Sequence, residues 1–547
     1  MKLNTMKYKY IASIALILVS FSCSDLTVLN ENPNGIEAKQ VNPNLILPTV
    51  LTEASKSFLN LGFGDIAGVV QHIQKDAFWG SVNDYQWSDQ SWAGYYGILV
   101  NNKLLYDRSV ELDMQFHQGV SLVIRAMMFA LITDLWGDAP YSKALNGDLS
   151  GLENTLPAYD NQEDIYMGII ADLKKANDLL SKNAEEYIGL GDGTDLIYNN
   201  DPTKWRKMAN SLLLRYYMRI SPKLPDVAQI GMEEIMADQS KYPIITSSDD
   251  DATMGFAGNT PGDSWPNNTV SDPSTSNYRR IRMCETFVDR LQTLNDPRLA
   301  VWANKVEIPL VIDAGLPSGT DTIIAEIRYL SPDKVDGIPY NDDPEYVGLP
   351  VGINLPAGYN INDGADQTGG NRNVSLLNPI YREPSGDLLK VRLISASEVH
   401  FTLAEAALKG WIVGDAQQHY KEAINASFET WGISDEYATY IGQSEVSYAG
   451  TLDQILEQKW IASWTATTEA WFDYRRTGLP AFQPGPHARR PALPIRFYYM
   501  RDEINLNADN TNAAINKLDE NNAYTQEDGK NSAWSKSWLI QGTGKPW

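Results

Sequence analysis

The sequence has 547 residues, and 43% of them are hydrophobic, which is typical of a globular protein rather than of a disordered or membrane-embedded one. Its formal net charge of −24 at pH 7 would repel a phosphate backbone, so nucleic acid is excluded as an expected partner. A chain of this length can bury a large core and does not depend on a disulfide or a metal for stability.

The N-terminus has the pattern of a bacterial lipoprotein signal. Three lysines fall within the first nine residues, and the apolar run Ile11–Phe21 that follows is too short to span a bilayer. Cys23 comes directly after this run, where a lipobox cysteine would receive its lipid, although Ser20 stands where the usual box has Leu. We predict a cleaved signal peptide over 1–22 and lipidation of Cys23. The alternative is an ordinary signal peptide with a chance cysteine. The other cysteine, Cys284, then has no disulfide partner.

The chain after the signal peptide is predicted to consist of a short tether and one domain. The tether is rich in Asn and Pro and has no clear periodicity, which is typical of an extended linker. The predicted parts are a lipid-anchored tether over 23–43 and a single domain over 44–547, with a helical scaffold over about 44–242 and 391–480, a loop-rich ligand-binding lobe over about 243–390 and an irregular C-terminal part over 481–547.

Helical periodicity dominates the first part of the domain. Apolar residues recur three and four positions apart over Gly119–Leu135, and Tyr166–Leu180 continues this pattern. Trp205–Ile220 and Val227–Met236 read as a further pair of helices, separated by the Pro-containing turn Ser221–Pro225. These segments indicate helices that must pack on one another, because each has one apolar face.

A second helical block, over about Ser397–Arg476, resembles a tetratricopeptide repeat. Small residues there would let two helices approach closely while Tyr420 fills the space between them; the residues on this spacing are Leu403, Ala404, Ala416, Tyr420 and Ala423. Generic amphipathic packing is the alternative for any single pair. We predict a mainly α fold, in which a tetratricopeptide-like helical-pair scaffold carries a large loop-rich lobe. Val306–Ile312 and Thr322–Tyr329 are β-prone runs within that lobe.

No catalytic motif stands out in the sequence. The five histidines show no zinc-binding spacing, and neither a P-loop nor a nucleophile elbow is present. Carboxylates are abundant, so a glycosidase pair stays open. The acidic segments Asp249–Asp251 and Asp363–Asp366 could offer oxygen ligands to calcium, but neither follows the EF-hand pattern. We therefore predict no catalytic residue, metal ligand or cofactor, and a structural calcium ion is not indicated.

Aromatic residues carry the best signal for a ligand. The chain has 15 Trp and 28 Tyr against 13 Phe, and Trp and Tyr combine a flat apolar ring with a polar group, as contact with sugars requires. The loop Phe78–Trp87 and the segment around Trp265, which precedes a proline and is predicted to be exposed, are the main candidates. Trp79 and Trp87 could instead fill the core, and Trp92, Tyr95 and Tyr96 are expected mainly to pack. The predicted ligand-binding residues are Trp79, Asn83, Asp84, Tyr85, Trp87, Trp265, Tyr278, Tyr359 and Arg372.

An ordered set of motifs resembles the SusD/RagB family. The set starts with an Arg-Ala helix that leads into an aromatic-Gly-Asp-x-Pro-Tyr turn, and it extends over nearly the whole chain. No single motif is specific for the family, but the ordered set together with the lipoprotein signal is a strong match. The matching segments are Ile124–Ala126, Asp134–Tyr141, Pro157–Asp160, Asn295–Arg298, Ser397–Ala406, Trp471–Arg476 and Leu493–Arg496 with Asn505.

This resemblance implies a lipid-anchored protein on the exterior of a bacterial outer membrane. Such proteins cover a TonB-dependent transporter, capture oligosaccharides and pass them to the channel. In one branch they capture peptides. The resemblance implies structural roles for Arg125, Asp138 and Arg475, and it carries over no ligand-binding residue. Glycan capture without catalysis is the leading interpretation. The alternatives are peptide capture, a helical-scaffold glycosidase or polysaccharide lyase, and a purely structural transporter subunit.

Overall fold

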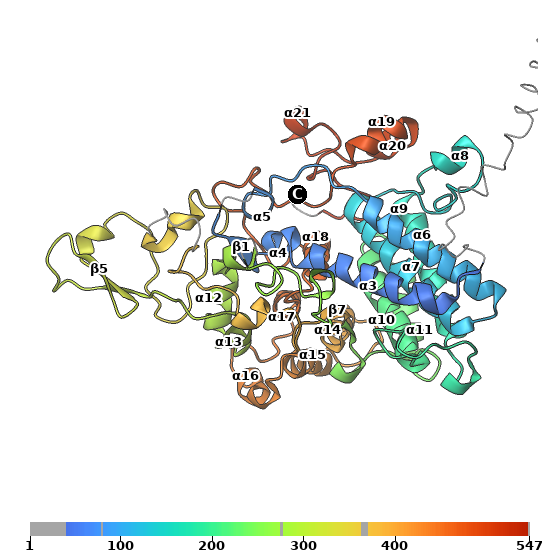
Figure 1. Ribbon diagram of the computed structural model, residues 1–547, viewed down its shortest axis with the longest axis horizontal. Helices are drawn as coiled ribbons and strands as arrows, with labels where there is room; N and C mark the ends of the chain where they lie inside the picture. The colour runs from blue at the N-terminus through green and yellow to red at the C-terminus, as the bar shows by residue number, and fades with distance from the viewer. Residues whose placement is uncertain (1–39, 78–79, 274–276, 363–369, 545–547) are drawn as a thin grey trace, which may run out of the picture. The chain divides into compact units, whose positions relative to one another are not determined.

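The computed structural model describes residues 40–77, 80–273, 277–362 and 370–544 (Figure 1). The chain divides into two units, Met1–Asn42 and Pro43–Trp547. The described part of the first unit is residues 40–42, and Cys23 lies outside it. Trp79, in the second unit, also lies outside the described residues.

Helices are the dominant regular structure of the unit Pro43–Trp547, and the strands are few and short (Figure 1), which confirms the predicted mainly α fold. The α-helices before the lobe are α3 Pro43–Gly62, α4 Asp65–Val69, α5 Gly80–Asn83, α6 Ala93–Glu111, α7 Gln115–Trp136, α8 Leu152–Thr155, α9 Gln162–Leu179, α10 Pro202–Ile220 and α11 Pro225–Ala237. The lobe and the second helical block contain α12 Glu285–Thr293, α13 Arg298–Trp302, α14 Ala396–Leu408, α15 Ala416–Thr430, α16 Tyr437–Ile441, α17 Leu452–Ala462 and α18 Thr468–Thr477.

Short 3-10 helices punctuate the connecting segments. They are η2 Ala184–Glu186, η3 Ser248–Asp250, η4 Pro261–Asp263, η5 Asn277–Arg280, η6 Pro332–Lys334, η7 Pro356–Ile361, η8 Pro379–Arg382 and η9 Ser434–Glu436. The C-terminal part, predicted to be irregular, contains three short helices, α19 Arg501–Leu506, α20 Ala508–Asn516 and α21 Thr525–Asp528. Sequence periodicity misses them because each is only one to three turns long and has at most a narrow apolar face.

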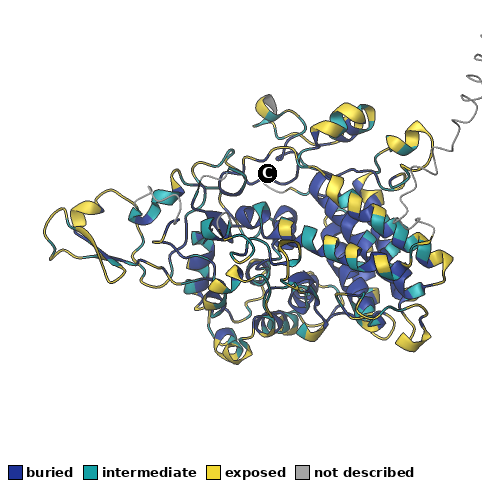
Figure 2. Cartoon of the chain, viewed as in Figure 1, coloured by how far each residue is buried: buried dark blue, intermediate teal, exposed yellow. Residues whose placement is uncertain are grey.

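The helices of the scaffold pack against one another in a chain of neighbours. α6 contacts α3 and α7, α9 contacts α7 and α10, and α10 contacts α11 and α14, which in turn packs on α15 and α17. Close approach requires a small residue between α10 and α11, because a Cβ atom on Gly231 would lie 2.2 Å from the ring of Tyr217. In the pair formed by α14 and α15, Tyr420 and Ala423 of α15 are fully buried, as the tetratricopeptide-like spacing predicts. Figure 2 shows the buried residues concentrated along these helices.

α7 is the central helix of the first block. It is long and apolar enough by length and composition to cross a membrane, but 94% of its most apolar window is buried inside the fold. Its neighbours α6 and α9 cover it from two sides. α7 is therefore a core helix. It is covered by other helices on most of its surface, so it has almost no polar face.

A buried network of charges joins the two helical blocks. Arg219 of α10 bridges Asp134 of α7 and Glu469 of α18. One turn earlier, Arg215 donates from Nε to Glu398 of α14 across 2.6 Å. Buried charges are costly unless they are paired, so these contacts fix how the block around α7 and α10 meets the block around α14 and α18.

The three residues for which the resemblance implies structural roles make contacts within the fold. Arg125 donates from Nη1 to both carboxylate oxygens of Asp172, at 2.9 and 2.6 Å. Asp138 accepts a hydrogen bond of 2.9 Å from the backbone N–H at the start of α9. Arg475 is buried and donates to two backbone carbonyls, Asp134 at 2.6 Å and Ile495 at 2.9 Å.

Within the described residues, the strands are short and pair in three small sheets. β1 (Ile73–Lys75) pairs antiparallel with β3 (Ile281–Met283), and β2 (Ala252–Met254) pairs antiparallel with β7 (Val391–Ile394). The third sheet has the order β4-β6-β5, in which β4 runs parallel to β6 and β5 runs antiparallel to it. Its strands are β4 Leu310–Ile312, β5 Asp321–Ile324 and β6 Ile327–Leu330.

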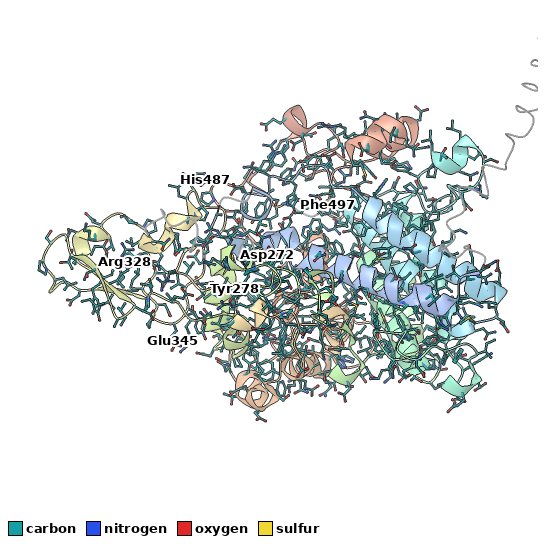
Figure 3. All side chains as sticks on the ribbon, viewed as in Figure 1. Asp272, Tyr278, Arg328, Glu345, His487 and Phe497 are labelled. Atoms are coloured by element: carbon teal, nitrogen blue, oxygen red, sulfur yellow. The ribbon has the colours of Figure 1, made fainter. Side chains whose placement is uncertain are left out.

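The β-prone run Thr322–Tyr329 is a hairpin rather than one strand. Ala325 and Glu326 have φ of 51° and 61° and form the turn between β5 and β6. Two consecutive positive φ values match a turn whose twist suits hairpins. The turn carries neither Asn nor Gly, so the usual sequence signal for it is missing. Arg328, labelled in Figure 3, pins the hairpin by donating to Asp321 on the opposite strand across 2.8 Å.

Candidate functional site

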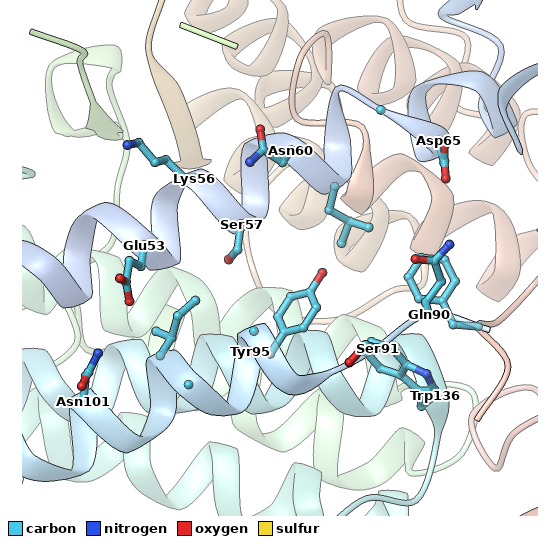
Figure 4. A pocket seen from close by; sticks show the side chains of 16 residues that line it. Glu53, Lys56, Ser57, Asn60, Asp65, Gln90, Ser91, Tyr95, Asn101 and Trp136 are labelled. Carbon is cyan, nitrogen blue, oxygen red and sulfur yellow. The ribbon is translucent and has the colours of Figure 1, made fainter. Parts of the chain in front are cut away.

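A cleft of about 820 Å³ opens between α3 and α6 (Figure 4). This volume lies within the range of small-molecule binding sites. Residues after α5 and in the C-terminal segment close one end of it. The lining side chains discussed below are the aromatic residues Tyr95, Trp136 and Phe497 and the polar residues Glu53, Ser57, Asn60, Asp65, Gln90, Ser91 and Asn101.

Three aromatic rings form one wall of the cleft: Tyr95 is the accessible ring, and Trp136 and Phe497 are buried behind it. Tyr95 meets Trp136 edge to face with centroids 5.9 Å apart, and Trp136 meets Phe497 with centroids 5.4 Å apart. Trp136 is held in place because its Nε1 donates to the carbonyl of Tyr498 across 2.9 Å. Burial raises the pKa of Tyr95 to about 12, so its phenol keeps its proton at neutral pH and can donate a hydrogen bond. Figure 4 shows this ring rising from α6 towards α3.

Polar side chains of α3 face Tyr95 across the cleft, and Asn101 of α6 adds a polar group on the same side as Tyr95. Glu53, Ser57 and Asn60 follow one another at spacings of four and three residues, which places them on one face of α3. Asn101 of α6 lies on the other side, near Glu53 in Figure 4. An aromatic wall opposite amide, hydroxyl and carboxylate groups can contact both the apolar face and the hydroxyl rim of a sugar ring.

Asp65, the first residue of α4, lies at one end of the cleft. It accepts a hydrogen bond of 2.9 Å from Ser81 Oγ. Burial raises its pKa above the usual value, although the Ser81 contact and the charge of Lys75 oppose the shift. A partly buried carboxyl with one bonded oxygen has acceptor capacity left for a ligand hydroxyl.

The described part of the predicted loop, residues 80–87, is mostly buried and does not line the cleft. Asn83, Asp84, Tyr85 and Trp87 are all buried, so the structure contradicts the expectation that they present their side chains to a ligand. Part of this predicted loop, Gly80–Asn83, forms the short helix α5 instead. The reason is tertiary: Asn83 bonds both the N–H and the C=O of Lys75, at 3.0 and 2.7 Å, and this fixes the turn.

Trp87 supports the aromatic wall from behind. Its ring packs edge to face against Phe497 with centroids 5.1 Å apart, and its Nε1 donates to the carbonyl of Ser81 across 2.9 Å. Trp87 therefore lies next to the cleft, but its side chain does not line it.

Trp265 and Tyr278 are also buried, which corrects the prediction that Trp265 is exposed. Only 1% of Trp265 is accessible, and its ring packs among Phe63, Phe256 and Tyr381. The Asn-rich loop around it folds inward because its backbone pairs with the segment at residues 382–384. Tyr278, labelled in Figure 3, donates from its hydroxyl to the carbonyl of Leu377 across 2.9 Å.

Tyr359 and Arg372 are the more accessible members of the predicted set. Tyr359 is partly buried against a small apolar cluster that includes Val347 and Val374. Arg372, whose side chain is 45% exposed, donates to Glu307 across 3.1 Å. Both belong to the lobe, and neither lines the cleft between α3 and α6.

Two carboxylates of the acidic run Asp249–Asp251 already have partners in the protein. Asp250 forms an ion pair of 2.6 Å with Lys207, and Asp251 accepts from the N–H of Ala396 across 2.7 Å at the start of α14. The segment Asp363–Asp366 lies outside the described residues. Cys284 is buried as a free thiol, and burial raises its pKa to about 12.

Several residues of the cleft were not singled out in the sequence. Tyr95 was expected to pack, yet it forms part of the aromatic wall, and Glu53, Asn60 and Asn101 sit within otherwise regular helices. The available signal was the repeat of polar side chains on one face of α3. A row of this kind on a helix is usually just a solvated face, so it becomes informative only once α6 is placed opposite.

Comparisons with known proteins place the chain in a family. The family model described as SusD-like, starch-binding and associating with the outer membrane, matches residues 37–323 and 334–500. Comparison with curated proteins gives no match.

Three solved structures illustrate the similarity. A SusD homologue from Bacteroides fragilis has 22% identity and a TM-score of 0.69, with 92% of this chain and 100% of that chain covered. A chitin-binding SusD homologue from Flavobacterium johnsoniae has 21% identity and a TM-score of 0.67, with 91% and 99% covered. A SusD homologue from Bacteroides uniformis has 20% identity, a TM-score of 0.67 and the same coverages. At these identities the structures show a shared fold, and the family model supplies the assignment: this chain belongs to the SusD-like family.

Proposed function

We propose that this protein captures glycans at the surface of a bacterial outer membrane, without cleaving them, through the cleft between α3 and α6. The observation that carries the proposal is the aromatic wall of Tyr95, Trp136 and Phe497 facing the polar side chains of α3. Membership of a family described as starch-binding supports a carbohydrate ligand. The similarity to a chitin-binding homologue makes chitin oligosaccharides a natural probe beside starch.

The expected affinity is weak. An aromatic contact adds about 0.5–1.5 kcal/mol beyond the area that it buries. Tyr95 is the ring of the wall that is only partly buried, so stacking is limited and polar contacts supply the remainder. Such a site corresponds to dissociation constants between roughly micromolar and millimolar. A weak site suits a protein that must release its ligand to a transporter, and the proposed recipient is a TonB-dependent outer-membrane channel.

The anchor in this proposal is a lipid on Cys23. The short apolar run before this cysteine supports export and cleavage, and residues 23–43 would connect the lipid to the folded domain. Several acyl chains, each adding about 0.8 kcal/mol per buried CH₂, give stable attachment. Replacing Cys23 with Ser in the producing cells should move the protein from the membrane fraction to the soluble fraction. Retention of the variant in the membrane fraction would refute the anchor without touching the glycan site.

Affinity electrophoresis of the protein in gels containing starch, chitin derivatives or other polysaccharides tests glycan capture. We expect retardation by at least one glycan and its loss in Tyr95→Ala. Tyr106→Ala is the matched control, because Tyr106 lies on the same helix outside the cleft. Release of new reducing ends would favour a glycosidase instead. Retention of peptides but of no glycan would favour peptide capture.

A further inference from the structure

Two histidines and a glutamate converge between α14 and α15, and none of them lines the cleft between α3 and α6. His400 of α14 and His419 of α15 face each other through their Nδ1 atoms at 3.0 Å. Glu422, one turn after His419, places Oε2 at 3.3 Å from His400 Nδ1 and 3.7 Å from His419 Nδ1. Three ligand-type atoms from two helices therefore surround one point.

The hydrogen bonds of the two imidazoles do not balance without an added cation. His400 Nε2 lies 3.1 Å from the carbonyl oxygen of Thr246, and His419 Nε2 lies 3.1 Å from that of Val413. A carbonyl can only accept, so each Nε2 must carry a proton. Two neutral imidazoles have no further proton, and both Nδ1 atoms then present lone pairs to each other. A third proton or a metal ion is needed between them.

A metal ion placed between the two Nδ1 atoms balances this contact without a further proton. A metal ion removes the conflict in one step, because both lone pairs and the carboxylate become ligands. Neutral imidazole and carboxylate are ordinary zinc ligands.

We propose that His400 Nδ1, His419 Nδ1 and Glu422 Oε2 bind a divalent transition-metal ion such as Zn²⁺. Zinc bonds of about 2.0–2.1 Å at tetrahedral angles separate the ligand atoms by about 3.3–3.4 Å. The three separations here, 3.0, 3.3 and 3.7 Å, bracket that value. The ion would link α14 to α15, the tetratricopeptide-like pair.

The surroundings suit such a site. Metal-bound histidines usually donate their other N–H to a carbonyl or carboxylate, and both Nε2 atoms are placed for this. The loop before α15 comes close to His419 at Gly414, where φ is 120° and a Cβ atom would lie 2.5 Å from Nε2. Glu422 is 41% exposed while His400 is only 5% exposed, so the side of the glutamate is open for a water molecule as fourth ligand.

Titration of the purified protein with Zn²⁺ by calorimetry, and with Co²⁺ by visible absorption, tests the site. We expect one ion per chain and the intense bands of tetrahedral Co²⁺. Glu422→Gln should weaken Zn²⁺ binding by about tenfold or more, and His419→Ala should abolish the bands. Glu429→Gln, two turns further along α15, is the matched control and should bind as the unaltered protein does.

The result that overturns the proposal is equally concrete. If Zn²⁺ does not bind, the contact is balanced by a protonated imidazole paired with Glu422. If Zn²⁺ binds equally well to the protein and to both variants, the ion binds to the acidic surface and not to this site. Because Glu422 is substantially exposed, Glu422→Gln should keep the fold even where a histidine substitution disturbs the helical pair. Circular dichroism of each variant establishes that it is folded.

Discussion

The ring of Tyr95 stands at 75° to the ring of Trp136, with centroids 5.9 Å apart. Trp136 is fully buried and bonded to the backbone, whereas Tyr95 is only partly buried. The buried indole thus sets the position of a ring that is itself accessible in the cleft. Preorganised aromatic side chains lose little conformational entropy on binding. Because Tyr95 is both accessible and held in place by Trp136, substituting it is the most direct test of the cleft.

Tyr95→Ala should weaken glycan binding by a factor of roughly 2 to 13, which corresponds to losing about 0.5–1.5 kcal/mol of aromatic contact. The change removes the accessible ring and leaves Trp136 in place. Calorimetric titration with the glycan that retards the protein most would measure it. Unchanged affinity in Tyr95→Ala, beside unchanged affinity in Tyr106→Ala, would remove the cleft from the proposal.

Trp265→Ala should destabilise the protein rather than abolish ligand contact. The indole is buried among three other aromatic rings, and deleting a buried Trp typically costs about 3–5 kcal/mol. A lowered midpoint of thermal unfolding, with unchanged affinity of the folded fraction, is the expected result. Trp411→Ala is the control, because Trp411 is only partly buried. A variant that keeps its stability and loses binding would restore Trp265 as a ligand residue.

The helical scaffold was predictable because its signals are local. Gly119–Leu135 and Trp205–Ile220 have apolar residues at helical spacing, and both lie within observed helices. The contact spacing around Tyr420 likewise predicted a packed pair. Periodicity reports which face of a segment is apolar, and in a repeat-like fold neighbouring segments cover each other, so these local signals sufficed for the fold class.

The ligand-facing residues were not predictable in this way. The same Trp can serve as a platform or as core, and the choice depends on distant segments such as residues 382–384, which bond the loop around Trp265. The pairing of His400 with His419 is another case, because 19 positions separate them and no metal motif has that spacing. Exposure and convergence are properties of the folded chain, and no local pattern encodes them.

Asp473→Asn should destabilise the second helical block. Burial would raise the pKa of Asp473, but the Lys459 ammonium at 2.7 Å and the Arg476 guanidinium at 2.9 Å outweigh it and hold this pKa well below its usual range. Neutralising the carboxylate leaves Lys459 buried without its countercharge. Breaking a buried pair costs about 3–5 kcal/mol.

Thermal unfolding at pH 7 measures this loss. The control is Asp502→Asn, in the exposed first turn of α19, which should unfold as the unaltered protein does. Equal midpoints for both variants would show that the charge of Asp473 contributes nothing to the fold.

Asp251→Asn should change how stability depends on pH. Burial raises the pKa of Asp251 to about 7, more than the nearby Arg392 and the hydrogen bonds lower it, whereas an unfolded Asp titrates near about 3.9. Between these values the folded state binds more protons, so this group makes stability fall as pH rises from about 4 to 7, and the cost is complete above 7. An Asn side chain carries no charge and can keep both hydrogen bonds. Its oxygen can accept from the N–H of Ala396, and its amide can donate to Thr430 Oγ1, which lies 3.2 Å from Asp251 Oδ2.

The measurement is the midpoint of thermal unfolding of both proteins at pH 5 and pH 7.5. The difference between the variant and the unaltered protein isolates Asp251 from the other carboxylates, because those titrate alike in both. The variant should gain stability relative to the unaltered protein on going from pH 5 to pH 7.5, by up to about 1.4 kcal/mol for each unit of pKa shift. A difference that stays constant with pH would mean that Asp251 titrates normally in the folded protein, so that the Ala396 N–H and Arg392 compensate fully for its burial.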